Sequence, residues 1–139
     1  MQDKDAAAEN IRYVALAPRP VLPLIEQTAQ AVEQLQDIKA ARKEHFVALY
    51  LNARYELLHK ELVSIGTVNA SIVHPRDVFA PAILHNATAI IVAHNHPSGD
   101  ATPSQEDREV THRLKEAGRL LGISVLEHII ITPYGYSTL

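Results

Sequence analysis

The spacing of apolar residues predicts which parts of the chain are helical. Between residues 24 and 43, apolar and small positions recur at intervals of three and four, which predicts a long surface helix. The positions that carry this pattern are Leu24, Thr28, Ala31, Leu35, Ile38 and Arg42. A second helix is expected over residues 76–86, with Pro81 inside it. Residues 1–19 are polar and then Ala-rich, and we expect a flexible tail there.

Other stretches have the pattern of β-strands. Residues 45–51 and 55–65 are strand-like and are separated by a turn at 52–54, which predicts a β-hairpin. Residues 88–93 are apolar without alternation, as expected for a central strand covered on both faces. Residues 123–131 form a last apolar run and predict a second buried strand.

The helix between the two buried strands has clear start and stop signals. Thr102 can serve as its N-cap, and Pro103 occupies the first helical position, where proline is favoured. Gly118 and Gly122 bracket its end. Strand, helix and strand then form a βαβ crossover, which should be parallel and right-handed. Together with the hairpin, this unit predicts an α/β fold with a mixed sheet.

Composition narrows the class of protein. The chain has 139 residues, a formal net charge of −3 and no cysteine. This length suits a single domain, placed at 20–139, with an N-terminal helix (20–43) and a core (45–132). Without cysteine there is no thiolate zinc site, and the acidic balance gives no field that would attract a nucleic-acid backbone. We expect a cytoplasmic protein, because the sequence shows neither a secretory signal nor an apolar run that could cross a bilayer.

Four polar residues after the central strand are placed for one task. His94 and His96 are two apart at the end of that strand, so both imidazoles point to the side where open α/β sheets place ligands. Asp107 heads the apolar stripe of the next helix, where an ionised carboxylate needs a partner or a metal. Ser104 shares that face of the helix. Because Thr102 can cap the helix, Ser104 and Asp107 are expected to be free for a site.

Two histidines and an aspartate make three protein ligands and leave a fourth position for water. This is the pattern of catalytic zinc, not of closed structural zinc. Taken singly, a histidine at a strand end is usually a polar terminus and Ser-x-x-Asp is usually a capping box, but their combination has no simple structural explanation. The motifs of zinc deaminases and of helical zincins are absent. We therefore predict a Zn²⁺ site at His94, His96 and Asp107.

The same residues carry a family resemblance. The spacing His94-x-His96-x₇-Ser104-x₂-Asp107 matches the JAMM motif of the JAB/MPN metalloproteases without insertion or deletion. The resemblance covers roughly residues 45–132. The surrounding segments are similar to those of the RadC-type branch: GTVNAS at 66–71, HPRDV at 74–78 and LEHIII at 126–131.

This resemblance implies both a fold and an activity. The fold would be an MPN domain with a cytidine-deaminase-like α-β-α architecture, and the βαβ unit would carry the metal site. The activity would be zinc-dependent hydrolysis of an amide or isopeptide bond in a protein or peptide substrate. His94, His96 and Asp107 would hold zinc, Ser104 would bind the oxyanion, and a glutamate of the hairpin would be the general base.

In this sequence the predicted general base is Glu61. With period two, Glu61 shares one face of its strand with three apolar residues, Leu57, Val63 and Ile65. An apolar setting of this kind suits a general base. The alternative is an edge-strand salt bridge between Glu61 and Lys60 or another exposed cation. Glu56, beside the turn, competes for the same role.

Other interpretations stay open at this point. The chain could be a metal-stabilised binding module that no longer turns over, or a factor associated with DNA repair, although its charge argues against autonomous DNA binding. Asn95 could contact the metal site or a substrate, or simply form a turn. His128, in an apolar strand, is expected to be a core residue with satisfied hydrogen bonds. The hairpin edge and the N-terminal helix could support a homodimer.

Overall fold

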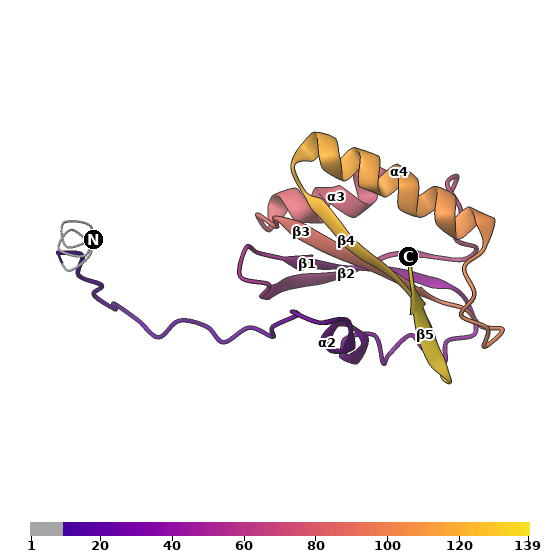
Figure 1. The fold of residues 1–139 in the computed structure, drawn as a ribbon, viewed down its shortest axis with the longest axis horizontal. Coiled ribbons are helices and arrows are strands. Elements are labelled where there is room, and N and C mark those ends of the chain that lie inside the picture. The colour runs from indigo at the N-terminus through magenta and orange to yellow at the C-terminus, as the bar shows by residue number, and fades with distance from the viewer. Residues whose placement is uncertain (1–9) are drawn as a thin grey trace, which may run out of the picture.

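A five-stranded mixed sheet forms the middle layer of the computed structural model, which describes residues 10–139 (Figure 1). The strand order is β2-β1-β3-β4-β5. Within the described residues, β3 and β4 pair in parallel, and the other neighbours pair antiparallel. The predicted hairpin, mixed sheet and parallel βαβ unit are therefore confirmed. The strands are β1 (His45–Leu51), β2 (Leu57–Ile65), β3 (Ala89–Asn95), β4 (Ser124–Thr132) and β5 (Gly135–Thr138).

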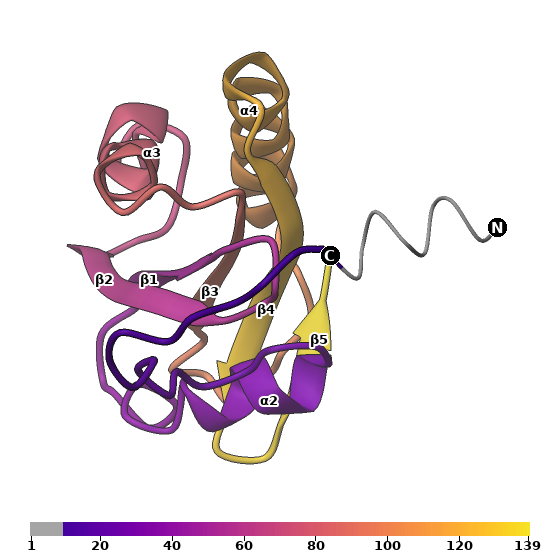
Figure 2. The ribbon, with the colours of Figure 1, turned by 90° about the vertical axis from the view of Figure 1, so that its left-hand side faces the viewer.

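Helices cover both faces of the sheet. Helices α3 (Pro75–Leu84) and α4 (Gln105–Leu121) lie on one face and the short helix α2 (Thr28–Glu33) lies on the other (Figure 2). Side chains of β1 alternate between two buried apolar clusters, with Phe46 on the α3 and α4 side and Val47 on the α2 side. The central strands are apolar without alternation because both of their faces are buried.

The predicted N-terminal helix is wrong in extent. Residues 24–43 contain only the six-residue helix α2, and Leu24 instead forms a β-bridge with Glu56. After α2 the chain continues in turns closed by i→i+3 hydrogen bonds. Tertiary contacts override the helical pattern, because Lys60 Nζ donates to the carbonyl of Gln34 (2.7 Å), which a continued helix would use for itself. The pattern still identified buried positions: Ala31, Leu35 and Ile38.

The start of α4 also differs from the prediction, since its N-cap is Ser104 and not Thr102. Ser104 Oγ accepts from the N–H of Asp107 (3.1 Å), and Asp107 Oδ2 accepts from the N–H of Ser104 (2.9 Å). This reciprocal capping box satisfies two backbone donors. The Thr102 hydroxyl donates instead to Asp100 (2.7 Å). The predicted end of the helix is confirmed, because Gly122 is its C-cap with φ 73°.

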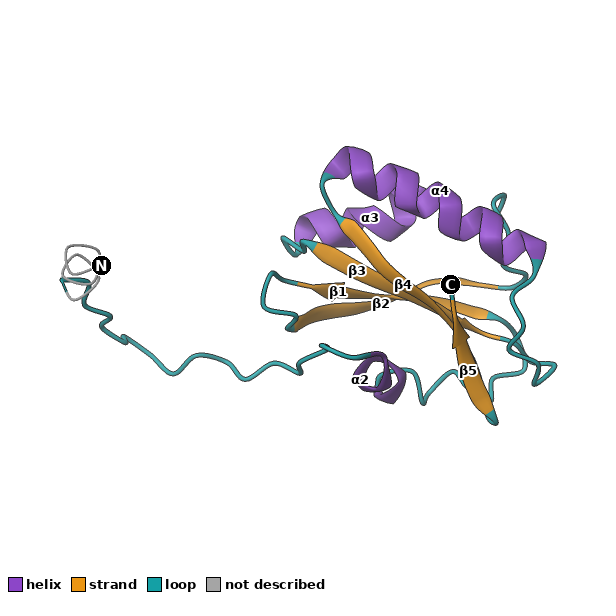
Figure 3. Cartoon of the chain, viewed as in Figure 1, coloured by secondary structure: helices purple, strands orange, loops and turns teal. Residues whose placement is uncertain are grey.

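The segments at the two ends of the chain add little to the core. Residues 1–9 of the predicted tail lie outside the described part, and residues 10–19 run along an exposed path away from the sheet (Figure 3). Strand β5 was not predicted, because its four residues are too few for a periodic signal. It fastens the loop before α4, since the Ser137 hydroxyl donates to the carbonyl of Ala101. No helix in residues 10–139 has the length and apolar character needed to cross a membrane.

Candidate metal centre

The central strand brings two histidines to one end of the sheet. His94 lies in β3 between Phe46 of β1 and Ile130 of β4. The chain leaves the sheet at His96, whose N–H donates to the carbonyl of Ile131 (3.1 Å). His94 is fully buried, whereas the side chain of His96 is 13% exposed. The site therefore has one closed side and one side that solvent can reach.

Helix α4 brings the third donor to the same place. Asp107 is in its first turn and is only 2% exposed, as its position on the apolar stripe predicts. Its Oδ1 atom lies 3.1 Å from Nε2 of His94, and its Oδ2 atom lies 3.1 Å from Nε2 of His96. The two Nε2 atoms are 3.1 Å apart. The structure thus brings the three predicted ligands together, with donor atoms within 4.8 Å of one another.

This arrangement fits a tetrahedral cation site. Zinc ligands at about 2.0–2.1 Å, placed at the corners of a tetrahedron, are roughly 3.3 Å apart, close to the 3.1 Å separations here. The Nδ1 atom of His96 lies 2.7 Å from the carbonyl oxygen of Asp100. A carbonyl only accepts, so the proton of a neutral His96 is on Nδ1 and its Nε2 carries a lone pair. A lone pair that faces a carboxylate is repelled unless a cation lies between them, so the donor set fits zinc.

The electrostatics of Asp107 keep it anionic. Burial would raise the pKa of Asp107, but its contact with His94 and the hydrogen bond from the N–H of Ser104 hold that pKa well below its ordinary value. The N-terminus of α4 adds the positive end of its dipole. The carboxylate is therefore available as a charged ligand at neutral pH.

Ser104 lies beside the three donors. Its Oγ accepts from the N–H of Asp107, so that bond does not use its hydroxyl proton. A hydroxyl proton that can still be donated is what an oxyanion-binding group requires. Ser104 and Asp107 both cap α4 and line the site, so the expectation that Thr102 would free them from capping was wrong.

Glu61 is not in contact with this group. It lies in β2 opposite Ala48, and its Oε1 atom is 2.6 Å from Nε2 of His59. Its side chain is 41% exposed, so the apolar setting expected from the pattern is not what the structure shows. Register shifts between β1 and β2 break the strict alternation, and Leu57 and Val63 consequently pack on opposite faces of the sheet.

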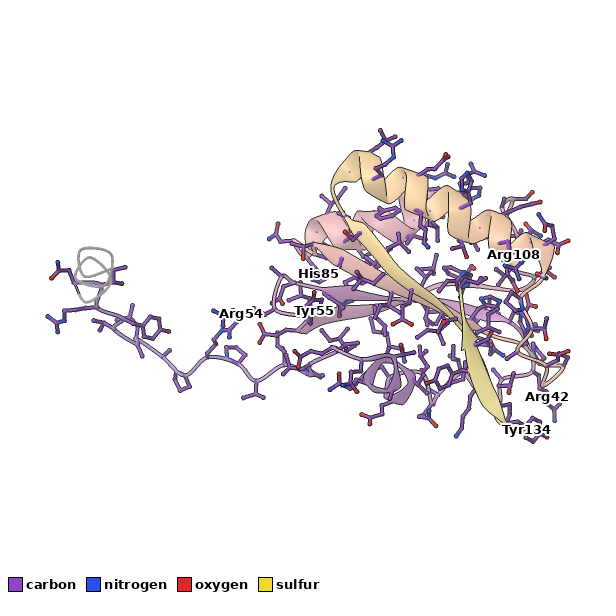
Figure 4. The ribbon with its side chains drawn as sticks, viewed as in Figure 1. Arg42, Arg54, Tyr55, His85, Arg108 and Tyr134 are labelled. Atoms are coloured by element: carbon purple, nitrogen blue, oxygen red, sulfur yellow. The ribbon has the colours of Figure 1, made fainter. Side chains whose placement is uncertain are left out.

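Lys60, the expected salt-bridge partner of Glu61, and Glu56, its competitor as general base, have other positions and contacts. Lys60 pairs with Asp37 (2.8 Å) and not with Glu61. Glu56 lies at the hairpin turn, next to Tyr55. Figure 4 shows Tyr55 at the opposite end of the sheet from Arg108, which follows Asp107 in α4.

A further glutamate, missed in the sequence, lies at the metal end of the sheet. Glu44 directly precedes β1, and Phe46 pairs with His94 and stacks on its ring. Residues two apart in extended chain share a face, so the side chain of Glu44 is expected on the face of Phe46. Its Oε2 atom accepts from the N–H of Val68 (2.6 Å). Only the register of β1 against β3 could have identified Glu44, and the sequence does not specify that register.

Asn95 holds the segment that leads into β1. It is fully buried, and its amide donates to the carbonyls of Ala41 and Lys43 (both 3.0 Å). Its Oδ1 accepts from the N–H of His45 (2.6 Å). Asn95 therefore forms neither a turn nor a contact with the three donors, and its bonds fix the backbone next to Glu44.

His128 is buried, as expected, but its partner is a predicted metal ligand. Its Nε2 atom lies 2.8 Å from Nδ1 of His94, and its Nδ1 atom lies 2.5 Å from Oγ1 of Thr111. Burial lowers the pKa of His128 to about 3, so this ring is neutral at ordinary pH. The strand pattern gave no signal for this contact, because it depends on the pairing of β3 with β4.

Comparison with known proteins agrees with this geometry. The profile of the family described as "RadC-like JAB domain" matches residues 25–139. A UPF0758 protein of Geobacillus thermodenitrificans is 49% identical over 122 residues, which cover 88% of this chain and 50% of that protein. A UPF0758 protein of Geobacillus kaustophilus is 50% identical over 121 residues, which cover 87% of this chain and 53% of that protein. A UPF0758 protein of Halalkalibacterium halodurans is 48% identical over 120 residues, which cover 86% of this chain and 48% of that protein. The chain thus spans about half the length of these relatives. On this match and on the arrangement of its site, the chain belongs to the RadC-like JAB domain family.

Proposed function

We propose that the chain is a zinc-dependent hydrolase that cleaves an amide bond, as a metallopeptidase or an isopeptidase does. One observation carries this proposal. The donor atoms of His94, His96 and Asp107 converge at 3.1 Å, and His96 leaves one side of the group accessible to solvent. Membership of the RadC-like JAB domain family supports the same chemistry. We propose a protein or a peptide as the substrate.

Each residue of the site would have a separate role. When bound, zinc would supply a water acidic enough to act as a nucleophile near neutral pH. His94, His96 and Asp107 would hold the ion and leave the open side for the substrate. The Ser104 hydroxyl would donate to the carbonyl oxygen as that atom gains negative charge. Loss of such a donor typically costs about 10²–10³ in turnover.

A glutamate would take a proton from the attacking water and deliver it to the leaving amine. Transfers of this kind typically contribute about 10²–10⁴ in rate. The family resemblance proposes Glu61 for this role, although Glu61 is engaged with His59. The alternative is Glu44, because it directly precedes β1 at the end where Phe46 pairs with His94. The test of function therefore substitutes both glutamates.

The test compares Glu44→Gln and Glu61→Gln with wild type, and Glu109→Gln on the exposed face of α4 is the control. Zinc content is measured by elemental analysis of the purified proteins. Cleavage is measured in cells that express each form, as new peptide N-termini for a peptidase and as loss of lysine isopeptide conjugates for an isopeptidase. All three variants should keep zinc, because none changes a ligand. The variant of the general base should lose this cleavage, while the control should retain it.

Other outcomes would change the proposal. A folded wild-type protein that takes up no zinc would contradict it. A wild type that binds zinc but cleaves neither peptide bonds nor isopeptide bonds in these assays would instead be a silent binding module. Salt-dependent retardation of DNA in a gel would favour a factor associated with DNA repair.

A further inference from the structure

The two ligand histidines differ in what holds the nitrogen that points away from the donor group. For His96 this partner is the carbonyl of Asp100, which can only accept a hydrogen bond. For His94 it is Nε2 of His128, at 2.8 Å. A neutral imidazole nitrogen either donates or accepts, so His128 alone does not decide which nitrogen of His94 carries the proton. The next group along the chain of hydrogen bonds has to decide it.

That next group is the hydroxyl of Thr111. Its Oγ1 atom lies 2.5 Å from Nδ1 of His128 and 2.9 Å from the carbonyl oxygen of Asp107 in the preceding turn of α4. The hydroxyl has one proton, and the carbonyl can only accept. Thr111 therefore donates to Asp107 and accepts from the Nδ1–H of His128. The Nε2 atom of His128 is then bare, accepts from the Nδ1–H of His94, and leaves Nε2 of His94 with its lone pair.

We propose that His128 and Thr111 are positioning residues that select the tautomer of His94 able to bind zinc. With the opposite direction of donation, Nε2 of His94 would carry a proton and could not be a ligand. This inference rests on the proposed zinc site.

Burial makes this chain of hydrogen bonds effective. His94 and His128 are fully buried and Thr111 is 7% exposed, so solvent offers few alternative partners. The ring of Phe46 stacks on that of His94, with 6.0 Å between the ring centroids, and packs edge-on against that of His128, with 5.6 Å between the centroids. These contacts restrict rotation of both rings. The direction of the protons is therefore the remaining variable, and Thr111 controls it.

The first test is the pair Thr111→Val and Thr111→Ser. Valine has nearly the shape of threonine but no hydroxyl, whereas serine keeps the hydroxyl. Zinc affinity is measured by competition with a chromophoric chelator, without any substrate. We expect Thr111→Val to bind zinc about 10–100-fold more weakly, as is typical when a partner behind a metal ligand is lost. Thr111→Ser should stay close to wild type, and equal affinity of valine and wild type would overturn the proposal.

A second test measures the protonation directly and does not depend on a variant that must fold. Long-range ¹H–¹⁵N spectra of the zinc-loaded wild type should show His128 protonated on Nδ1 and not on Nε2. A proton on Nε2 of His128 would refute the proposed direction. Neither test uses hydrolysis, so an inactive protein that passes both would keep this inference and lose only the proposed function. Equal zinc binding by wild type and Thr111→Val would refute this inference and leave the proposed function unaffected.

Discussion

Replacement of Asp107 separates its two roles, because the same carboxylate completes the capping box of α4 and faces two imidazoles. Asp107→Asn keeps a side-chain oxygen that can accept from the N–H of Ser104. Asp107→Ala removes that oxygen. Both variants lose the negative charge that faces His94 and His96. The two variants should therefore differ in stability without zinc but respond alike to the addition of zinc.

The expected magnitudes follow from these contacts. Without zinc, the alanine variant should be less stable than the asparagine variant by about 0.5–2 kcal/mol, which is the usual effect of losing a helix cap. A ligand at about 100 times its Kd stabilises the wild type by about 2.7 kcal/mol. For a domain of this size, that free energy corresponds to a rise in Tm of roughly 10 °C. Both variants should show only a small part of this rise, because each lacks one of three ligands.

Thermal unfolding followed by circular dichroism, in a chelator and then in excess zinc, measures both effects. Asp100→Asn is the matched control, because the carboxylate of Asp100 bonds to Thr102 and lies in an exposed loop. Its main-chain carbonyl, which holds His96, is unchanged by this substitution. The control should keep the full response to zinc. If zinc raised the Tm of Asp107→Ala as much as that of wild type, the assignment of Asp107 as a ligand would be refuted.

Two further predictions concern residues that support the ends of the sheet. Asn95→Asp sets a carboxylate against two carbonyl oxygens, and we expect the free energy of unfolding to fall by at least about 3 kcal/mol, as for other unpaired buried charges; an unchanged midpoint in urea would contradict the bonds assigned to this amide. The pKa of Glu56 lies below its ordinary value of 4.5, because its carboxylate accepts a hydrogen bond from Asn52 and forms an ion pair with Arg19. Burial acts in the opposite direction and is the weaker influence. A carboxylate whose pKa is lowered by folding stabilises the folded state at pH values above 4.5, and this stabilisation is lost as the pH falls below that value. Glu56→Gln should therefore lower the Tm at neutral pH, and in acid its Tm should approach that of wild type. A difference in Tm that is the same at both pH values would argue against this pairing.

The sequence by itself determined the three predicted ligands. His94 and His96 point to one side because side chains two apart in a strand share a face, and Asp107 faces inward because it heads an apolar helical stripe. These are local periodicities of a strand and of the helix that follows it. The buried positions of the N-terminal segment were also readable, because the spacing of Ala31 and Leu35 records which side faces the sheet.

Only the tertiary structure decided the features that depend on pairing between distant segments. The helix expected over residues 24–43 shortens to α2 because Lys60, from β2, takes a carbonyl that the helix would have used. Glu44 approaches the metal end only through the register of β1 against β3, and His128 reaches His94 only because β3 and β4 are neighbours. Hydrogen bonds of this kind join residues far apart along the chain. Their partners become neighbours only when the sheet assembles, and the local pattern of apolar and polar residues does not predict which strands will pair.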